Sequence, residues 1–349
     1  MGRKIELLLP EKINGFRKTE RSIYVPTKDA IKKHLERLVP KTDSLPAKYI
    51  PQGNENLVLA AARSTKSSVM LSGPTGVGKT LLVSNYAAEE KLPLLILTAH
   101  EDLTDGKIRG TSDLLIVPAS DEGGNVHDLK IKTFAPTHLV LAAMADMPVV
   151  LFVDELHKVR EGVSSLFHSV TNERMVYCHE LTGENYRLHD DTLVIASVNP
   201  SYGDGGIDRI DPALRRRFTT IDLQMPRDIK LMEIVKANIG SDAYEEHEPL
   251  IMALVKVQGQ ILDAFKGKEL KPEELAEMSS HLRDPATVNS LIEAPSPDSI
   301  VKTIKMIAEG LDARTAIEVQ MINQIINDFG GPKAALITVI EEELPSNYR

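Results

Sequence analysis

The sequence predicts an α/β fold in which a parallel sheet with crossover helices is followed by an all-α domain. Between residues 49 and 225, short apolar runs alternate with stretches of helical periodicity, whereas after residue 226 only helical periodicity remains. The runs are continuously apolar, which is typical of strands buried on both faces of a parallel sheet. A glycine-rich loop separates the first run from the first helix, as in phosphate-binding α/β proteins. We therefore expect a basic extension at 1–48, an α/β domain at 49–225 and a helical domain at 226–349.

The basic extension contains one predicted helix. Thr27 is its expected N-cap and Asp29 lies in its first turn, and both features are typical of helix starts. Ile31, Leu35 and Leu38 follow at helical spacing, so this helix has one apolar face.

The remaining elements follow from the same patterns. The predicted strands of the sheet are 67–73, 93–99, 147–155, 192–199 and 219–225. The predicted helices are 81–91 in the α/β domain and 228–239, 249–265, 299–311 and 314–328 after it.

Composition excludes several classes of protein. The 349 residues include one cysteine, Cys178, which rules out a disulfide framework and thiolate-rich metal sites. No apolar run reaches the roughly 18 residues that a membrane helix needs, and the apolar run near the N-terminus is too short for a signal peptide. We expect a cytoplasmic protein that does not span a membrane.

Charge is distributed unevenly along the chain. Residues 1–50 hold 12 Lys and Arg against 6 Asp and Glu, and the remainder holds 29 against 44. An acidic body argues against coating by nucleic acid. The basic extension could bind an acidic partner or nucleic acid, or be a solvated segment.

The glycine-rich loop predicts a nucleotide-phosphate site. Its residues are Gly73, Pro74, Thr75, Gly76, Val77, Gly78, Lys79 and Thr80, and they match G-x-x-x-x-G-K-[ST] between a predicted strand and a predicted helix. The glycines allow backbone N–H groups to surround phosphates at the positive end of a helix. Lys79 supplies a positive charge, and the Thr80 hydroxyl can ligate Mg²⁺.

Polar residues at the ends of two later strands add to this site. The strand at 147–155 ends in Asp154 and Glu155, and buried carboxylates are costly unless they meet a metal or a reacting water. Asp154 is therefore a candidate Mg²⁺ ligand, and Glu155 is a candidate for polarising the attacking water. Asn199 follows the strand at 192–199 and could orient that water, although Asn-Pro alone also indicates a turn.

Three consecutive arginines, 215–217, precede the last predicted strand. Such a run is usually a solvated patch. In a phosphate-loop enzyme, a guanidinium that reaches the γ-phosphate of a neighbouring subunit stabilises the charge of the transition state. This second possibility requires an oligomer.

Taken in order, the motifs GPTGVGKT, VVLFVDE, VIASVNP and DPALRRRF resemble those of the AAA+ ATPases, specifically the helix-2-insert group. The segments YIPQGNENLVLAA, AHEDLTDGKIRG and IAEGLDARTA are similar to the CbbQ/NorQ/GvpN branch of the MoxR family. Residues 101–146 are longer than a simple crossover needs, and 174–191 look like the β-hairpin that this group places before its sensor strand. The likeness covers about 49 to 329.

The resemblance implies a role for each motif. It implies that Lys79 and Thr80 bind ATP and Mg²⁺, that Asp154 and Glu155 form the Walker B pair, and that Asn199 is sensor 1. It also implies that Arg217 acts in trans on the neighbouring subunit, with Arg216 as the reserve candidate. The implied assembly is a homo-oligomeric ring, most often a hexamer, with a helical lid on each subunit. A von Willebrand A-domain protein would be its partner in acting on a client.

One position departs from the family pattern. Where the branch usually carries a Ser-Thr-Arg sensor 2, this chain has Ser296, Pro297 and Asp298. An aspartate near a γ-phosphate would repel it, so the usual sensor 2 is expected to be absent or replaced. Lys302 and Arg283 are the candidate replacements.

Three functions remain open from the sequence. The first is an ATP-driven machine that remodels or activates a partner protein. The second is a nucleic-acid motor that grips DNA or RNA through the basic extension or loops of the ring. The third is a scaffolding ring with slow ATP turnover, which the missing sensor 2 arginine makes credible.

Overall fold

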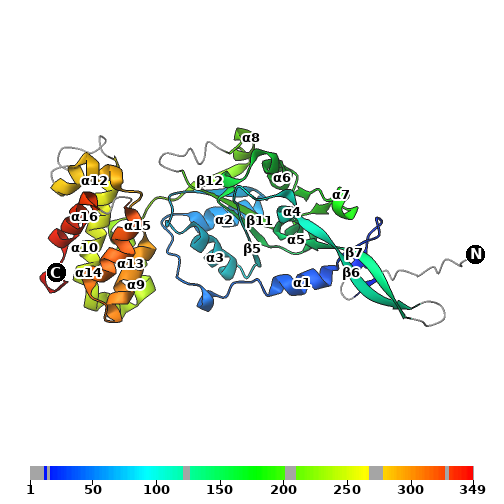
Figure 1. Ribbon diagram of the computed structural model, residues 1–349, viewed down its shortest axis with the longest axis horizontal. Helices are drawn as coiled ribbons and strands as arrows, with labels where there is room; N and C mark the ends of the chain where they lie inside the picture. The colour runs from blue at the N-terminus through cyan, green and yellow to red at the C-terminus, as the bar shows by residue number, and fades with distance from the viewer. Residues whose placement is uncertain are drawn as a thin grey trace, which may run out of the picture. The chain divides into compact units, whose positions relative to one another are not determined.

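The chain forms two compact units, each with its own core (Figure 1). The computed structural model describes residues 12–13, 16–120, 126–200, 210–266, 278–326 and 330–348. Unit 1 is formed within Met1–Leu45, Asn54–Gly73 and Lys79–Asp222, and unit 2 within Pro46–Gly53, Pro74–Gly78 and Leu223–Arg349.

Unit 1 is built on a five-stranded parallel sheet, which confirms the predicted fold class. Its strands are β4 (Ser68–Ser72), β5 (Leu94–Thr98), β8 (Val150–Asp154), β11 (Leu193–Val198) and β12 (Phe218–Asp222). Their spatial order is β12-β4-β11-β8-β5, and every pair is parallel. The carboxyl ends of β4, β8 and β11 therefore lie at the same edge of the sheet.

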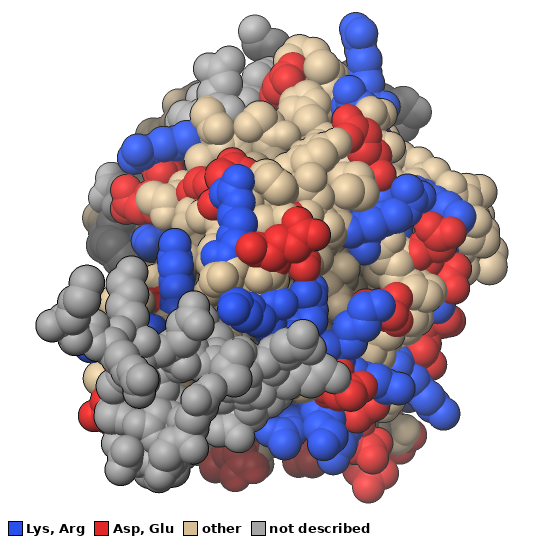
Figure 2. Space-filling view, turned by 90° about the vertical axis from the view of Figure 1, so that its right-hand side faces the viewer, with Lys and Arg blue, Asp and Glu red and all other residues tan. Residues whose placement is uncertain are grey.

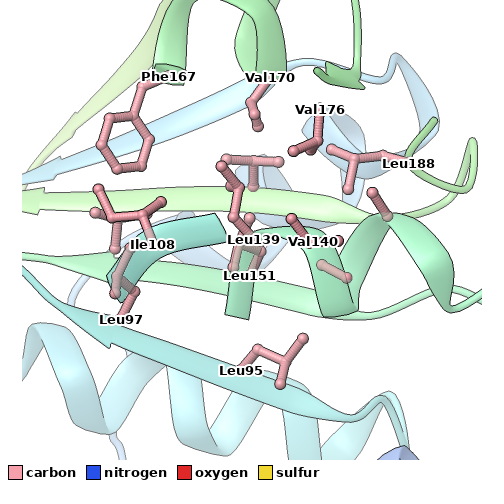
Figure 3. Packing of buried hydrophobic residues seen from close by; sticks show 14 of the residues in the cluster. Leu95, Leu97, Ile108, Leu139, Val140, Leu151, Phe167, Val170, Val176 and Leu188 are labelled. Carbon is pink, nitrogen blue, oxygen red and sulfur yellow. The ribbon is translucent and has the colours of Figure 1, made fainter. Parts of the chain in front are cut away.

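Helices follow the strands and complete the core of unit 1. They include α2 (Glu55–Ser64), α3 (Lys79–Glu89), α4 (Asp105–Arg109), α5 (His138–Met144) and α6 (Glu161–Asn172). Side chains of β5, β8, α4, α5 and α6 point toward one another in Figure 3, where Leu97, Leu151 and Phe167 lie in the same cluster. This packing fixes the strand ends that carry the polar residues.

A second sheet combines the start of the chain with the long segment between β5 and β8. It contains β1 (Lys12–Ile13), β2 (Phe16–Lys18), β3 (Ile23–Pro26), β6 (Gly110–Ser120) and β7 (Val126–Pro136), in the order β1-β2-β3-β7-β6. Strands β6 and β7 pair as an antiparallel hairpin, and β3 pairs with β7 in parallel. The excess length at 101–146 is thus a hairpin joined to the start of the chain.

Up to Leu45, the described part of the basic extension packs into unit 1. Helix α1 (Lys28–Glu36) begins as predicted, because the Thr27 hydroxyl accepts a hydrogen bond from the Ala30 amide. Ile31 and Leu35 of this helix lie in the core of unit 1 together with Val25 of β3. A short 3₁₀ turn, η1 (Thr42–Ser44), follows. For these residues, the interpretation as a solvated arm is wrong.

Basic residues of the extension also pair with acidic residues of unit 1. The Arg17 guanidinium donates two hydrogen bonds to the Glu184 carboxylate, and the Lys28 ammonium lies 2.5 Å from Asp146 Oδ2. On the face shown in Figure 2, basic and acidic side chains are interspersed. For Arg17 and Lys28, the acidic partner is the chain's own body.

The segment before β11 contains a small hairpin. Strands β9 (Met175–Val176) and β10 (Tyr186–Arg187) pair in antiparallel fashion on either side of the short helix α7 (His179–Thr182). A 3₁₀ turn, η2 (Leu156–Lys158), follows β8, and the short helix α8 (Pro212–Arg215) precedes β12.

The regular elements among the described residues of unit 2 are helical, apart from one isolated bridge between Leu291 and Ile326. Its elements are α9 (Asp228–Ile239), α10 (Ser241–Lys266), η5 (Ser280–Arg283), α12 (Pro285–Ser290), α13 (Pro297–Ala308), α14 (Ala313–Ile317), the π-helical turn η6 (Glu318–Ile322), α15 (Asn323–Ile325), α16 (Gly331–Glu343) and η7 (Ser346–Tyr348). Helix α10 starts before its predicted first residue and runs through Pro249. None of the helices in the described ranges combines the length and apolar character required to traverse a bilayer.

Candidate nucleotide site

The glycine-rich loop connects β4 to α3. Gly76 and Gly78 adopt φ values of +76° and +98°, which glycine tolerates far better than residues with a Cβ. Lys79 is the first residue of α3, so the loop runs directly into the start of a helix. This is the local geometry that binds phosphate through backbone N–H groups.

Lys79 is buried at the edge of the sheet where β4 and β11 end. Its ammonium donates hydrogen bonds to the Gly73 carbonyl at 2.7 Å and to Asn199 Oδ1 at 2.6 Å. Burial lowers the pKa of Lys79 to about 8, although the nearby carboxylates of Asp154 and Glu155 act in the opposite direction. The structure thus brings Lys79 and Asn199 together, as the sequence predicts.

The acidic pair lies at the end of β8. Asp154 Oδ2 is 3.4 Å from the Thr80 hydroxyl, so the two candidate metal ligands are neighbours. Glu155 follows with a left-handed backbone at φ +59°, and its carboxylate pairs with Lys158 at 2.8 Å. Since Glu155 also contributes to the pKa of Lys79, its charge belongs to the same cluster.

The arginines lie at the end of α8, outside this cluster. Asp211 caps α8 by accepting a hydrogen bond from the Ala213 amide, and it contacts His168 Nε2 at 2.9 Å. Arg216 is exposed, whereas Arg217 is partly buried and its Nε has no hydrogen-bond partner within the described ranges. No hydrogen bond or ion pair between described residues joins Arg216 or Arg217 to the acceptors Asp154, Glu155 or Asn199.

The segment expected to hold sensor 2 begins α13 in unit 2. Ser296 caps this helix, and Asp298 forms an ion pair with Lys302 at 2.6 Å. The other candidate, Arg283, donates hydrogen bonds to the Met278 carbonyl at 3.0 and 2.6 Å. The acid in the sensor 2 position therefore has its own counter-charge one turn away.

Two polar residues of the site do not appear among the sequence predictions. Ser197 of β11 donates a hydrogen bond to Asp154 Oδ1 and accepts one from the Glu155 amide. Lys158 pairs with Glu155. Ser197 lies two residues before Asn199, so strand periodicity places both on one face and could have indicated it.

Known proteins resemble this chain in the same region. Residues 68–218 match the family model described as "AAA domain (dynein-related subfamily)". The protein NorQ of Paracoccus denitrificans is 26% identical over 280 residues, which is 80% of this chain and 88% of NorQ. The chain contains an AAA domain and is similar to AAA+ ATPases of the MoxR family. The protein CbbQ of Hydrogenophilus thermoluteolus is 27% identical over 56% of this chain and 67% of CbbQ. The denitrification regulatory protein NirQ of Stutzerimonas stutzeri is 25% identical over 66% of this chain and 74% of NirQ.

The AAA domain makes this chain a nucleotide-binding ATP hydrolase. Its donor set also fits Mg²⁺, because Thr80 and Asp154 supply two neighbouring hard oxygen ligands. Mg²⁺ in nucleotide sites is typically held by one or two protein oxygens together with water and phosphate. Among the described residues, no group of three His, Cys, Asp or Glu could hold a metal ion.

The lowered pKa of Lys79 predicts that the affinity for ATP depends on pH. Phosphate binds the protonated ammonium, so affinity should be constant below pH 8 and should fall by up to about tenfold per pH unit well above it. Binding should also take up a proton near pH 8, which calorimetry in buffers of different ionisation enthalpy would measure. The Lys79→Arg variant is the control, since a guanidinium stays protonated and should abolish this dependence. Equal ATP affinity of the parent protein at pH 7 and pH 9.5 would contradict the prediction.

Proposed function

We propose that this chain is a MoxR-type ATPase that hydrolyses ATP in a hexameric ring of identical subunits to remodel or activate a partner protein. The proposal includes a von Willebrand A-domain protein that acts with the ring on the client. The observation that carries the ATPase part is the cluster of Lys79, Asn199 and Asp154 at the meeting strand ends.

The chemistry follows from the positions of these side chains. When ATP binds, we propose that the Lys79 ammonium exchanges the Gly73 and Asn199 oxygens for phosphate oxygens. The Asn199 amide is then available to orient a water molecule. Glu155 accepts a proton from that water as the water oxygen attacks the γ-phosphorus, and the bond from this phosphorus to the bridging oxygen breaks to release ADP.

Thr80 and Asp154 would hold Mg²⁺, which when bound neutralises charge that develops on the phosphates. Many phosphate-loop enzymes also use a guanidinium to stabilise the negative charge of the transition state. Since Arg217 lies outside the cluster of its own chain, we propose that it acts on the site of the next subunit. The ring is therefore part of the catalytic proposal.

A nucleic-acid motor is less consistent with the charges. Arg17 and Lys28 of the basic extension are paired with Glu184 and Asp146. The face in Figure 2 mixes both signs of charge, whereas binding to phosphate backbones favours a continuous basic surface.

Partner capture tests the proposal. The Glu155→Gln variant should bind ATP without hydrolysing it, and purification from native cells with ATP and nuclease should retain the partner. The control is Lys79→Ala, which should lose ATP binding and with it the captured protein. A stoichiometric protein with a von Willebrand A domain, present only with Glu155→Gln, would support the proposal. Enrichment that nuclease removes would instead favour the nucleic-acid motor.

A further inference from the structure

Ser197 connects the two acidic residues through one hydroxyl group. It lies in the central strand β11, and its side chain is fully buried. Its Oγ donates a hydrogen bond to Asp154 Oδ1 at 2.5 Å and accepts one from the Glu155 amide at 2.9 Å. A serine hydroxyl has one donor and two acceptor positions, so a single side chain can make both contacts.

The first contact determines which Asp154 oxygen remains available. Because Oδ1 accepts the Ser197 hydrogen bond, Oδ2 is the oxygen that lies toward the Thr80 hydroxyl, at 3.4 Å. A carboxylate held at one oxygen cannot rotate freely about its terminal bond. Ser197 thereby orients the second oxygen toward the proposed Mg²⁺ ligand Thr80.

The second contact fixes the backbone of Glu155. At φ +59° this residue has a left-handed conformation, which is unfavourable for a residue with a Cβ. The hydrogen bond from its amide to Ser197 stabilises that conformation, and Lys158 holds Oε2 of its side chain. The other carboxylate oxygen of Glu155 has no hydrogen-bond partner within the described part of the chain.

We propose that Ser197 is a positioning residue for ATP hydrolysis, which sets the orientation of Asp154 and Glu155 together. Its hydroxyl couples the strand that carries Asn199 to the strand that carries the acidic pair. This inference rests on the proposed roles of Asp154 and Glu155. Loss of the hydroxyl should leave the nucleotide loop intact and misplace both carboxylates.

The chain contains a matched control for a buried serine. Ser68 lies in the adjacent strand β4 and is also buried, but its Oγ has no hydrogen-bond partner among the described residues. Replacing Ser68 with alanine changes the same sheet without touching the acidic pair. Any effect on folding that is common to buried serines would appear in both variants.

The test compares steady-state ATPase kinetics of the Ser197→Ala, Ser197→Thr and Ser68→Ala variants. Ser197→Ala should lower kcat by about 10- to 100-fold, the size expected when catalytic groups are misplaced by a fraction of an ångström or more. Its affinity for ATP without Mg²⁺ should stay within about twofold of the parent, while the Mg²⁺ concentration for half-maximal rate should rise. Ser197→Thr keeps the hydroxyl and should recover most of kcat.

Two results would overturn the role of Ser197. One is a kcat of Ser197→Ala within about twofold of the parent, and the other is an equal loss in Ser68→Ala. Glu155→Gln is measured alongside to separate this inference from the proposed function. If Glu155→Gln hydrolyses ATP normally, the proposed role of Glu155 fails, whatever Ser197→Ala does.

Discussion

Arg217→Ala is expected to lower the ATPase kcat by about 10³-fold while leaving the affinity of each subunit for ATP unchanged. A guanidinium supplied to the γ-phosphate stabilises charge in the transition state and contributes little to ground-state binding. Within one chain, Arg217 follows α8 and makes no hydrogen bond to the described cluster around Lys79. The effect should therefore depend on the neighbouring subunit.

Mixing two inactive variants tests this dependence. Arg217→Ala subunits keep their own ATP site, and Lys79→Ala subunits keep Arg217. Mixed rings should regain ATPase activity at interfaces where an intact Arg217 faces an intact Lys79. Arg215→Ala and Arg216→Ala are the matched controls, since both arginines are exposed on the same short segment. Absence of recovery in mixed rings, or a larger loss with Arg216→Ala, would contradict the assignment to Arg217.

The parallel sheet could be predicted because its central strands are apolar on both faces. All residues of β4 and β11 are buried, and the corresponding runs of sequence are nearly continuous in apolar or small residues. The edge strands differ: β5 alternates between buried and exposed positions, and β12 has none that is fully buried. The sequence still predicts β5 and β12, because each of their apolar runs lies between helical segments.

The hairpin of β6 and β7 was not predicted. Charged residues interrupt both strands, and Leu114, Leu115 and Ile116 of β6 are all exposed, so no simple alternation marks one buried face. Pairing between β3 and β7 joins residues more than 100 positions apart, as in Ile23 and Lys132. Local periodicity carries no information on such a pairing.

The candidate site likewise contains residues that the sequence predicts and one that it does not. The motif at 73–80 and the ends of two strands predict Lys79, Thr80, Asp154 and Asn199, which the structure brings together. These residues are far apart in the sequence but close in space, because the carboxyl ends of parallel strands lie at the same edge of a sheet. Ser197 was missed because a serine inside a buried strand has no chemical signature until its hydrogen-bond partners are known.

Removal of residues 1–45 is expected to destabilise unit 1 to the point of unfolding. This segment supplies Tyr24, Val25, Ile31 and Leu35, each at most 2% exposed. Truncation of one buried leucine or isoleucine typically costs about 2–5 kcal/mol, and a whole domain is stable by only about 5–15 kcal/mol. Loss of all four side chains, together with the pairing of β3 with β7, should approach that total.

A single substitution in α1 tests how much the extension contributes to the stability of unit 1. Leu35→Ala should lower the free energy of unfolding by about 2–5 kcal/mol, measured by urea denaturation. Lys32→Ala is the matched control on the exposed side of α1 and should change it by less than about 0.5 kcal/mol. If the shortened chain instead kept the parent's melting temperature and ATPase rate, the extension would be a separable arm. Its basic residues would then be free to dock a partner, whereas in the structure Arg17 and Lys28 bind acidic residues of the chain's own body.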